Sequence, residues 1–304
     1  MYDIIIIGGG PAGLSAAIYS ARGGMNTLLI EKFYTGGQMS TTDKIENYPG
    51  IESISGIELA LIIEKQAKSF GAKIVNEEVV GLELDSINKV VKTTNNTYMT
   101  KAVVLAMGAS PKELGVPGEK KLRGAGVSYC ATCDGAFFRN KVVAVVGGGN
   151  TAVEDAIFLS KLCKKVYLIH RRDSLRAEKI LQEAAISSGI EFVWGSAVDD
   201  IIGDSHVESL VIKDIKTGQT RSLEVNGIFV AIGRKPNSQL IRDIIDVDNS
   251  DYIYTDGNMQ TNIFGVFASG DIREKGIKQV VAAAADGAAA AMSAMRYINE
   301  HQWA

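Results

Sequence analysis

Ile4-Ile5-Ile6-Ile7-Gly8-Gly9-Gly10-Pro11-Ala12-Gly13, close to the start of the chain, is the stretch that decides the fold. The isoleucine run is typical of a strand buried on both faces, and the residues after it predict a helix over 12–22 and a strand over 28–31. In a G-x-G-x-x-G turn, the first glycine permits the tight turn and the second lets the backbone approach a pyrophosphate. The third lets the helix pack closely on the strand. With Glu31 placed to bind a ribose hydroxyl, the stretch predicts a dinucleotide site.

The same pattern returns in the middle of the chain. A strand over 141–146, a helix over 151–162 and a strand over 166–169 surround Gly147-Gly148-Gly149-Asn150-Thr151-Ala152. His170-Arg171-Arg172 stands as far from Gly147 as Glu31 stands from Gly8. A carboxylate there would repel a 2′-phosphate, whereas arginines bind one through paired hydrogen bonds. The second turn is therefore predicted to prefer NADPH.

Two cysteines lie just ahead of the second turn, in Cys130-Ala131-Thr132-Cys133-Asp134. A C-x-x-C pair can close and reopen a disulfide, and an adjacent acid can supply or remove the proton. Asp134 could instead cap a helix. A structural zinc site needs four Cys or His ligands, but the only other cysteine is Cys163 and the three histidines are scattered. The pattern thus favours a redox dithiol, with Cys163 as a buried, inert thiol.

Further repeats indicate an internal duplication. Residues 102–108 and 227–233 are both strands that end on glycine, and each is followed by a segment of linker composition, at 110–118 and 235–237. A strand over 266–271 and an Ala-rich helix from about Gln279 complete the chain. The pattern predicts an α/β fold with two Rossmann-like three-layer nucleotide-binding domains, the second inserted into the first.

Length and charge narrow the class of protein. A chain of 304 residues suggests about two domains. A net charge of −3 gives no footprint for nucleic acid, and no apolar run predicts a signal sequence or a membrane span. A cytoplasmic location is expected, where a C-x-x-C pair is more often redox-active or metal-binding than a structural disulfide.

The order of the motifs resembles one family over nearly the whole chain, that of the low-molecular-weight, bacterial-type thioredoxin reductases. The residues that carry the resemblance are Gly8-Gly9-Gly10-Pro11-Ala12-Gly13, Gly36-Gly37-Gln38, Glu46-Asn47-Tyr48-Pro49-Gly50, Cys130-Ala131-Thr132-Cys133-Asp134, Gly147-Gly148-Gly149-Asn150-Thr151-Ala152-Val153-Glu154, His170-Arg171-Arg172 with Arg176, and Gly270-Asp271.

This resemblance implies a homodimeric flavoprotein that uses FAD and NADPH and reduces thioredoxin. It implies an FAD domain of residues 1–112 and 241–304, split around an NADPH domain of residues 113–240 that carries the dithiol. The linkers would form the hinge of a rotation between the two domains. Cys133 would face the flavin, Cys130 would attack the thioredoxin disulfide, and Asp134 would handle the proton.

The resemblance also implies which residues bind the two cofactors. The expected contacts are Gly8, Gly10, Pro11, Ala12, Gly13, Glu31, Gly37, Gln38, Asn47, Val79, Gly108, Gly147, Gly149, Asn150, Thr151, Glu154, His170, Arg171, Arg172, Arg176, Ile232, Gly233, Gly270, Asp271, Lys278, Gln279 and Val280. Two positions depart from the family pattern, because Met107 replaces a common threonine and Lys278 replaces an arginine.

Other interpretations stay open for several of these features. Arg176 could pair with Glu178, Glu154 could be an ordinary solvated residue, and the Ala-rich helix could serve dimer packing as well as cofactor contact. At the level of function, the alternatives are a dithiol oxidase, a reductase of another thioredoxin-like partner, or a non-enzymatic redox sensor. The arginines after residue 170 argue against the oxidase, which has little use for NADPH.

Overall fold

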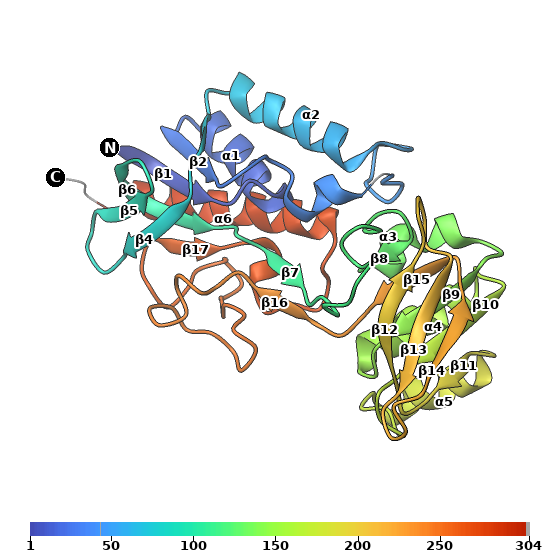
Figure 1. Cartoon of the computed structure of the whole chain (residues 1–304). Coiled ribbons are helices and arrows are strands. Elements are labelled where there is room, and N and C mark those ends of the chain that lie inside the picture. The colour runs from blue at the N-terminus through green and yellow to red at the C-terminus, as the bar shows by residue number, and fades with distance from the viewer. Residues whose placement is uncertain (43, 302–304) are drawn as a thin grey trace. The chain divides into compact units, whose positions relative to one another are not determined.

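The structure is a computed structural model that describes residues 1–42 and 44–301, and it divides into two compact units (Figure 1). The first unit combines Met1–Ser110 with the chain from Lys235 onward, and the second comprises Pro111–Arg234. The boundaries predicted after residues 112 and 240 lie a few residues further along the chain. The prediction of a mixed α/β fold with two Rossmann-like units is confirmed.

A largely parallel sheet forms the centre of the first unit (Figure 1). In spatial order the strands are β3 (Lys73–Asn76), β2 (Thr27–Glu31), β1 (Tyr2–Ile7), β6 (Thr97–Leu105), β5 (Lys89–Thr93) and β4 (Val79–Glu83), with β17 (Val266–Ala268) paired to β6. Strands β5 and β4 continue the sheet beyond β6 as an antiparallel meander, and β17 pairs with the C-terminal end of β6.

Both faces of this sheet are covered, which explains the unbroken isoleucine run of β1. Ile4 and Ile6 face one side and pack against α1 (Pro11–Arg22), α2 (Gly56–Ser69) and α6 (Val280–Glu300). Ile5 and Ile7 face the opposite side, where the meander and the segment 241–253 cover them. Alternate residues of a strand point to opposite faces, so a strand buried on both needs apolar side chains throughout.

Helix ends and helix packing follow local sequence. Ser55 and Glu58 form a capping box at the start of α2, in which each side chain accepts a hydrogen bond from the other's backbone N–H. The Ala-rich α6 packs against α1 so closely that a Cβ on Gly287 would lie 2.0 Å from the Ala12 carbonyl oxygen. Small side chains on α6 therefore serve packing inside the same chain.

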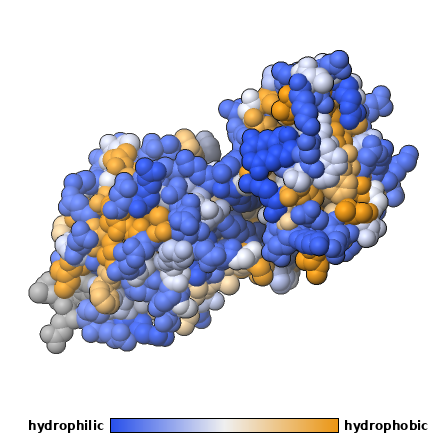
Figure 2. Space-filling model, turned by 90° about the horizontal axis from the view of Figure 1, so that it is seen from below, coloured by the Kyte–Doolittle hydropathy of each residue, from blue (hydrophilic) through white to orange (hydrophobic). Residues whose placement is uncertain are grey.

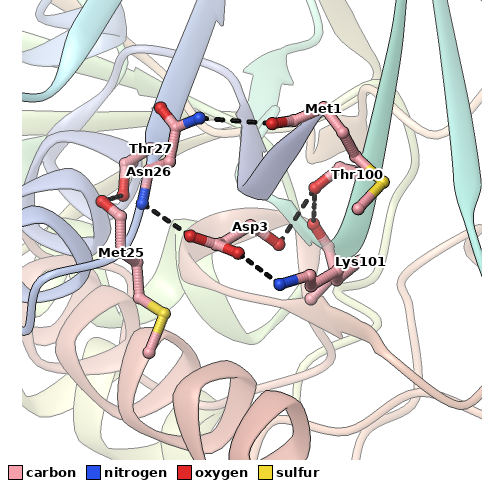
Figure 3. A network of polar contacts seen from close by, with 8 residues as sticks. Met1, Asp3, Met25, Asn26, Thr27, Thr100 and Lys101 are labelled. Carbon is pink, nitrogen blue, oxygen red and sulfur yellow. Dashed lines mark hydrogen bonds and ion pairs between the residues drawn. The ribbon is translucent and has the colours of Figure 1, made fainter. Parts of the chain in front are cut away.

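Polar contacts at the N-terminus tie β1 to its neighbours (Figure 3). Asp3 accepts hydrogen bonds from the Asn26 N–H at 2.9 Å and from Lys101 Nζ at 2.7 Å, and Thr100 Oγ1 donates to the Asp3 carbonyl at 3.0 Å. Burial acts to raise the pKa of Asp3, but the hydrogen bonds from Lys101 and the Asn26 N–H, together with the charge of Lys101, outweigh it and bring the pKa below its ordinary value. Asp3 thus remains a carboxylate that links three strands.

The second unit repeats the same layers. Its parallel sheet has the order β11 (Glu191–Val193), β10 (Lys165–Ile169), β9 (Val142–Val146), β15 (Gly227–Val230) and β8 (Val127–Ser128). Helices α3 (Ala131–Asp134), α4 (Asn150–Ser160) and α5 (Lys179–Ser187) cover one face. The antiparallel strands β12 (Ser196–Ile202), β13 (Ser209–Asp214) and β14 (Thr220–Glu224) cover the other.

The two connections between the units pair with each other as β7 (Ala109–Pro111) and β16 (Arg234–Pro236). On the side of the first unit, Asn237 fixes this pair through three hydrogen bonds. Its N–H donates to the Gly108 carbonyl at 3.0 Å, its Nδ2 donates to the Met107 carbonyl at 2.8 Å, and its Oδ1 accepts from Ser110 Oγ at 3.1 Å. The linkers are therefore ordered strands.

The surface carries exposed apolar side chains on both units, among them Phe264 and Ile180. Figure 2 shows one face, on which apolar areas interrupt a mostly hydrophilic surface. Across residues 1–42 and 44–301, none of the helices has the combination of length and apolarity that crossing a bilayer requires.

Candidate active site

The first glycine-rich turn has the geometry that its sequence predicts. Gly8 adopts a φ of +105°, and a Cβ there would lie 2.4 Å from the Ala106 carbonyl oxygen. A Cβ on Gly13 would lie 1.8 Å from the Gly8 carbonyl oxygen. The turn and the close packing of α1 on β1 therefore exclude any larger residue at these two positions.

The N-terminus of α1 is open to a ligand. Gly10 is the N-cap residue, no side chain caps the helix, and the first turn holds no acid. A Cβ on Gly10 would meet no atom within 4 Å. The first N–H groups of a helix have no partner inside the helix and attract anions. The turn thus fits the pyrophosphate of a dinucleotide.

Several of the residues predicted to bind FAD converge on this turn. Glu31 Oε2 accepts a hydrogen bond from the Gly9 N–H at 2.6 Å, and the Gly36 N–H donates to the Gly9 carbonyl at 2.7 Å. The Cβ position of Gly37 lies 3.3 Å from Gly10 Cα. The end of β2 and the turn at residues 36–38 therefore flank the N-terminus of α1.

The Gly270-Asp271 motif near the C-terminus also lies beside the first glycine-rich turn. Gly270 opens the short helix η3 (Gly270–Ile272), and its Cβ position lies 2.8 Å from Ala12 Cβ on α1. Gln279, the N-cap residue of α6, accepts a hydrogen bond from Asn47 Nδ2 at 3.3 Å. Lys278 Nζ lies 3.5 Å from the centre of the Tyr252 ring. Residues from distant parts of the sequence thus surround one site.

The second glycine-rich turn copies the first. A Cβ on Gly147 would lie 2.4 Å from the Ala231 carbonyl oxygen, the equivalent of the Gly8–Ala106 approach. Gly149 is the N-cap residue of α4, which has neither a side-chain cap nor an acid in its first turn. A Cβ on Gly149 would meet no atom within 4 Å. The helix therefore presents free N–H groups to an anion, as α1 does.

The basic residues after β10 differ in their exposure, because the histidine is buried and the arginines are exposed. His170 is only 6% exposed and lies beneath the turn, because a Cβ on Gly148 would fall 2.2 Å from its ring. Burial, followed by the charges of Arg176 and Arg172, lowers the pKa of His170 below its usual value. Arg171 and Arg172 are exposed, and the Arg176 N–H donates to the Gly148 carbonyl at 2.7 Å.

The alternative pairing of Arg176 with Glu178 can be compared with the structure. Among the described residues, Glu178 forms no ion pair with Arg176. Glu178 instead accepts a hydrogen bond from Asn150 Nδ2 at 2.9 Å, and its N–H donates to Asn150 Oδ1. In the part of the chain that the structure describes, the guanidinium groups of Arg171, Arg172 and Arg176 have no carboxylate partner. These cations thus remain available for an anionic ligand.

The remaining predicted contacts lie at the beginnings of helices and strands or just after strands end. Thr151 and Glu154 lie on the first turns of α4, and Ile232 and Gly233 follow β15. In the first unit, Gly108 follows β6 and Val79 begins β4, while Val280 begins α6. The Gly233 carbonyl accepts a hydrogen bond from the Lys112 N–H at 3.0 Å, which places it beside the linker.

The dithiol lies on a short helix that the sequence did not predict. Cys130 and Cys133 are joined as a disulfide, with Cys130 as the N-cap residue of α3. Cys130 Sγ lies 3.4 Å from Thr132 Oγ1. In residues 1–42 and 44–301, no cluster of three side chains suited to a metal ion occurs.

Asp134 ends α3 and is the N-cap residue of the short helix η2 (Gly135–Phe138), but its side chain makes no capping hydrogen bond there. Its Oδ2 instead accepts a hydrogen bond from Ser128 Oγ at 2.6 Å. Ser128 in turn accepts one from the Cys130 N–H at 3.1 Å. Sequence reasoning missed Ser128, because no spacing rule marks a serine two residues before a cysteine.

Cys163 has the environment of an inert thiol. It is half-buried and packs against the cluster formed by α4 and the sheet. Burial raises its pKa to about 11, so the reactive thiolate is rare at neutral pH. The free cysteine therefore takes no part in exchange chemistry.

Comparison with known proteins agrees with this geometry. The model of the pyridine nucleotide-disulphide oxidoreductase family matches residues 2–287. The chain belongs to this family. Among its relatives, it is 48% identical to a thioredoxin reductase of Peptoclostridium acidaminophilum, with 98% of each chain covered. It is 43% identical to the thioredoxin reductase of Bacillus subtilis, covering 99% of this chain and 96% of that one.

A solved structure extends the likeness to three dimensions. The thioredoxin reductase of Streptococcus pyogenes superimposes with a TM-score of 0.94 at 42% identity, with 99% of each chain covered. Thioredoxin reductases of the pyridine nucleotide-disulphide oxidoreductase family use FAD and NADPH. Both uncapped helix N-termini fit the pyrophosphates of such dinucleotides.

Proposed function

We propose that this chain is an NADPH-dependent thioredoxin reductase. The observation that carries the proposal is the combination of a disulfide beside a held carboxylate with three unpaired arginines, all in one unit of an oxidoreductase of this family. A dithiol oxidase would have no need for those arginines. The first unit is the FAD domain, and the second is the NADPH domain that carries the dithiol.

The two cofactors bind at the two uncapped helices. In the first unit, the N-terminus of α1 binds the FAD pyrophosphate, and Glu31 binds a ribose hydroxyl beside it. In the second unit, α4 binds the NADPH pyrophosphate, and Arg171, Arg172 and Arg176 bind the 2′-phosphate as bidentate donors. His170 is neutral and buried, so it supports the glycine turn from below.

The bound cofactors supply the two electrons that open the disulfide. Opening it with one proton leaves a Cys130 thiol and a Cys133 thiolate. The Asp134 carboxylate removes the thiol proton, and Cys130 Sγ then attacks one sulfur of the thioredoxin disulfide. A bond forms between Cys130 and thioredoxin while the other thioredoxin sulfur leaves and receives the proton from Asp134.

Cys133 completes the exchange. Its thiolate attacks Cys130 Sγ, which restores the Cys130–Cys133 disulfide and releases the second thioredoxin thiolate, which takes a proton from solvent. Both cysteines are therefore needed for turnover, but only Cys130 bonds to the partner.

The chain acts as a cytoplasmic homodimer that binds no nucleic acid. A net charge of −3 offers no phosphate-binding surface of the required extent. On α2, the side chains of Ile57, Leu61 and Ile62 are more than half exposed, which supports an association surface between two copies. Sedimentation equilibrium of the FAD-loaded protein tests the dimer, and a single species of monomer mass would contradict it.

Trapping the mixed disulfide tests the proposed exchange. The Cys133→Ser variant is mixed with a thioredoxin that retains one active-site cysteine, activated as an aromatic disulfide. We expect the two proteins to become linked through Cys130, as located by peptide mass spectrometry, while Cys130→Ser gives no such product. Linkage through Cys163, or oxygen consumption by the wild type with a small dithiol in place of any linkage, would contradict the proposal.

A further inference from the structure

Ser128 makes two hydrogen bonds that close the dithiol turn at both of its ends. Its Oγ lies 2.6 Å from Asp134 Oδ2, 3.1 Å from the Cys130 amide nitrogen and 3.4 Å from the Cys130 carbonyl oxygen. A serine hydroxyl has one proton to donate and lone pairs to accept with. The proton goes to the carboxylate, since that contact is much the shorter of the two, and the amide donates to the same oxygen.

The position of Ser128 is set by the sheet. It ends β8, the edge strand of the parallel sheet, where it pairs with Phe229 of β15. Ser128 is buried, with only 5% of its surface exposed. The hydroxyl is thus a fixed point of the sheet, from which both the N-terminal cysteine and the acid are held.

The bond to Asp134 is of the strong kind. An O–H···O⁻ hydrogen bond between a hydroxyl and a carboxylate has a typical length of 2.5–2.7 Å and about twice the strength of a neutral one. The helix between the two ends is short, and the Asp134 N–H donates to the Cys130 carbonyl at 3.1 Å. The Ser128 bond therefore joins the C-terminal end of this four-residue helix to the sheet through a side chain.

We propose that Ser128 is a positioning residue, which holds the Asp134 carboxylate in place beside the disulfide. This inference rests on the proposed function, in which Asp134 accepts the proton of Cys130. A donor that favours the carboxylate keeps the acid ready to accept that proton. Ser128 touches neither sulfur, so it acts only through Asp134 and the Cys130 backbone.

The direct test is a titration of Asp134 in the oxidised, FAD-loaded protein. Aspartate carboxyl carbons are labelled with ¹³C, and the Asp134 resonance is identified by its absence from Asp134→Asn. In Ser128→Ala we expect its titration midpoint to move to higher pH by about one unit, since one hydrogen bond to a charged group is lost. Ser196→Ala is the matched control, because Ser196 is equally buried and donates only to the Trp194 carbonyl.

An isosteric pair separates the hydroxyl from the shape of the side chain. Ser128→Thr should keep the wild-type midpoint and thioredoxin turnover, whereas Ser128→Val should show the raised midpoint and about a tenfold lower kcat with the KM for NADPH unchanged. This comparison also stands if Ser128→Ala does not fold. Because the titration needs no turnover, it gives a result even if thioredoxin is not the substrate. An unmoved midpoint in Ser128→Val, or equal shifts in Val and Thr, would overturn the proposal.

Discussion

Arg171 and Arg172 determine which nicotinamide cofactor the second unit prefers. Both guanidinium groups are exposed, and neither has a carboxylate partner among the described residues. In Arg171→Ala and Arg172→Ala we expect the KM for NADPH to rise about tenfold each, from the loss of one charge-assisted contact. The KM for NADH, which lacks the 2′-phosphate, should stay the same.

Two further variants sharpen this test. Arg176→Lys keeps the charge but loses the planar fork, so an intermediate KM for NADPH indicates bidentate binding. Arg221→Ala removes an exposed arginine from β14 and should change neither KM. Equal losses with NADPH and NADH would instead show that the arginines stabilise the fold.

Asp155 gives a second prediction at the residue scale, in the pH dependence of stability. Burial, followed by repulsion from Glu154, raises its pKa to about 6 from the ordinary aspartate value of 3.8. The folded state therefore binds a proton more tightly than the unfolded state does. This contribution to stability is present at low pH and is lost as the pH rises toward the folded pKa.

At neutral pH the folded protein holds Asp155 as a half-buried carboxylate, which is unfavourable. Replacing Asp155 by Asn should remove this unfavourable free energy. The difference between the folded and unfolded pKa values corresponds to a change in the free energy of unfolding on the order of 2–3 kcal/mol. We expect Asp155→Asn to raise the Tm at pH 7.5 by several degrees and to leave it nearly unchanged at pH 4, as followed by circular dichroism. A gain of the same size at both pH values would show that the titration is not its cause.

At the scale of elements, the first glycine-rich turn holds two glycines with different roles. We expect Gly13 to be required for folding and Gly10 for ligand binding. A Cβ on Gly13 would collide with the Gly8 carbonyl oxygen, whereas one on Gly10 would meet no protein atom within 4 Å. Gly13→Ala should therefore cost several kcal/mol or prevent folding. Gly10→Ala should melt like the wild type but bind FAD at least tenfold more weakly, as measured by flavin fluorescence. Normal FAD affinity in Gly10→Ala would place the pyrophosphate elsewhere.

The first linker depends on a buried carboxylate. Glu119 is 1% exposed and accepts hydrogen bonds from the Leu114 N–H at 2.9 Å, the Gly115 N–H at 2.8 Å and the Tyr129 hydroxyl at 2.8 Å. Burial first, and then the bond to Glu119, raise the pKa of Tyr129. The linker is thereby joined to the residue directly before Cys130.

Glu119→Gln should destabilise this element strongly. The substitution replaces one acceptor oxygen by a donor that would face an N–H or hydroxyl group, at a cost of about 1–3 kcal/mol in urea unfolding. Glu113→Gln, on the same linker, removes only exposed ion pairs with Arg123 and Lys120 and should cost less than about 0.5 kcal/mol. If the two variants were equally stable, the bonds of Glu119 would contribute nothing.

For the whole molecule, the sequence predicted the features that depend on local spacing. Both glycine turns, their flanking strands and helices, and the internal duplication follow from short motifs whose backbone demands are strict. The contacts that come from distant segments were out of reach of such rules. Ser128 meets Asp134 only because a sheet edge and a short helix bring them together, and Glu119 has no motif at all. The second domain boundary is predicted after residue 240 but lies after Arg234. The residues there have the composition of a loop, whereas Arg234–Pro236 pairs as a strand.

The most direct test of the central claim is NADPH oxidation by the FAD-loaded protein with thioredoxin disulfide as acceptor. NADH and the Cys130→Ser variant are measured beside it. We predict turnover with NADPH, at least tenfold weaker kcat/KM with NADH, and loss of thioredoxin reduction in the variant. Undiminished thioredoxin reduction by Cys130→Ser, or no NADPH oxidation by the wild type, would contradict the account.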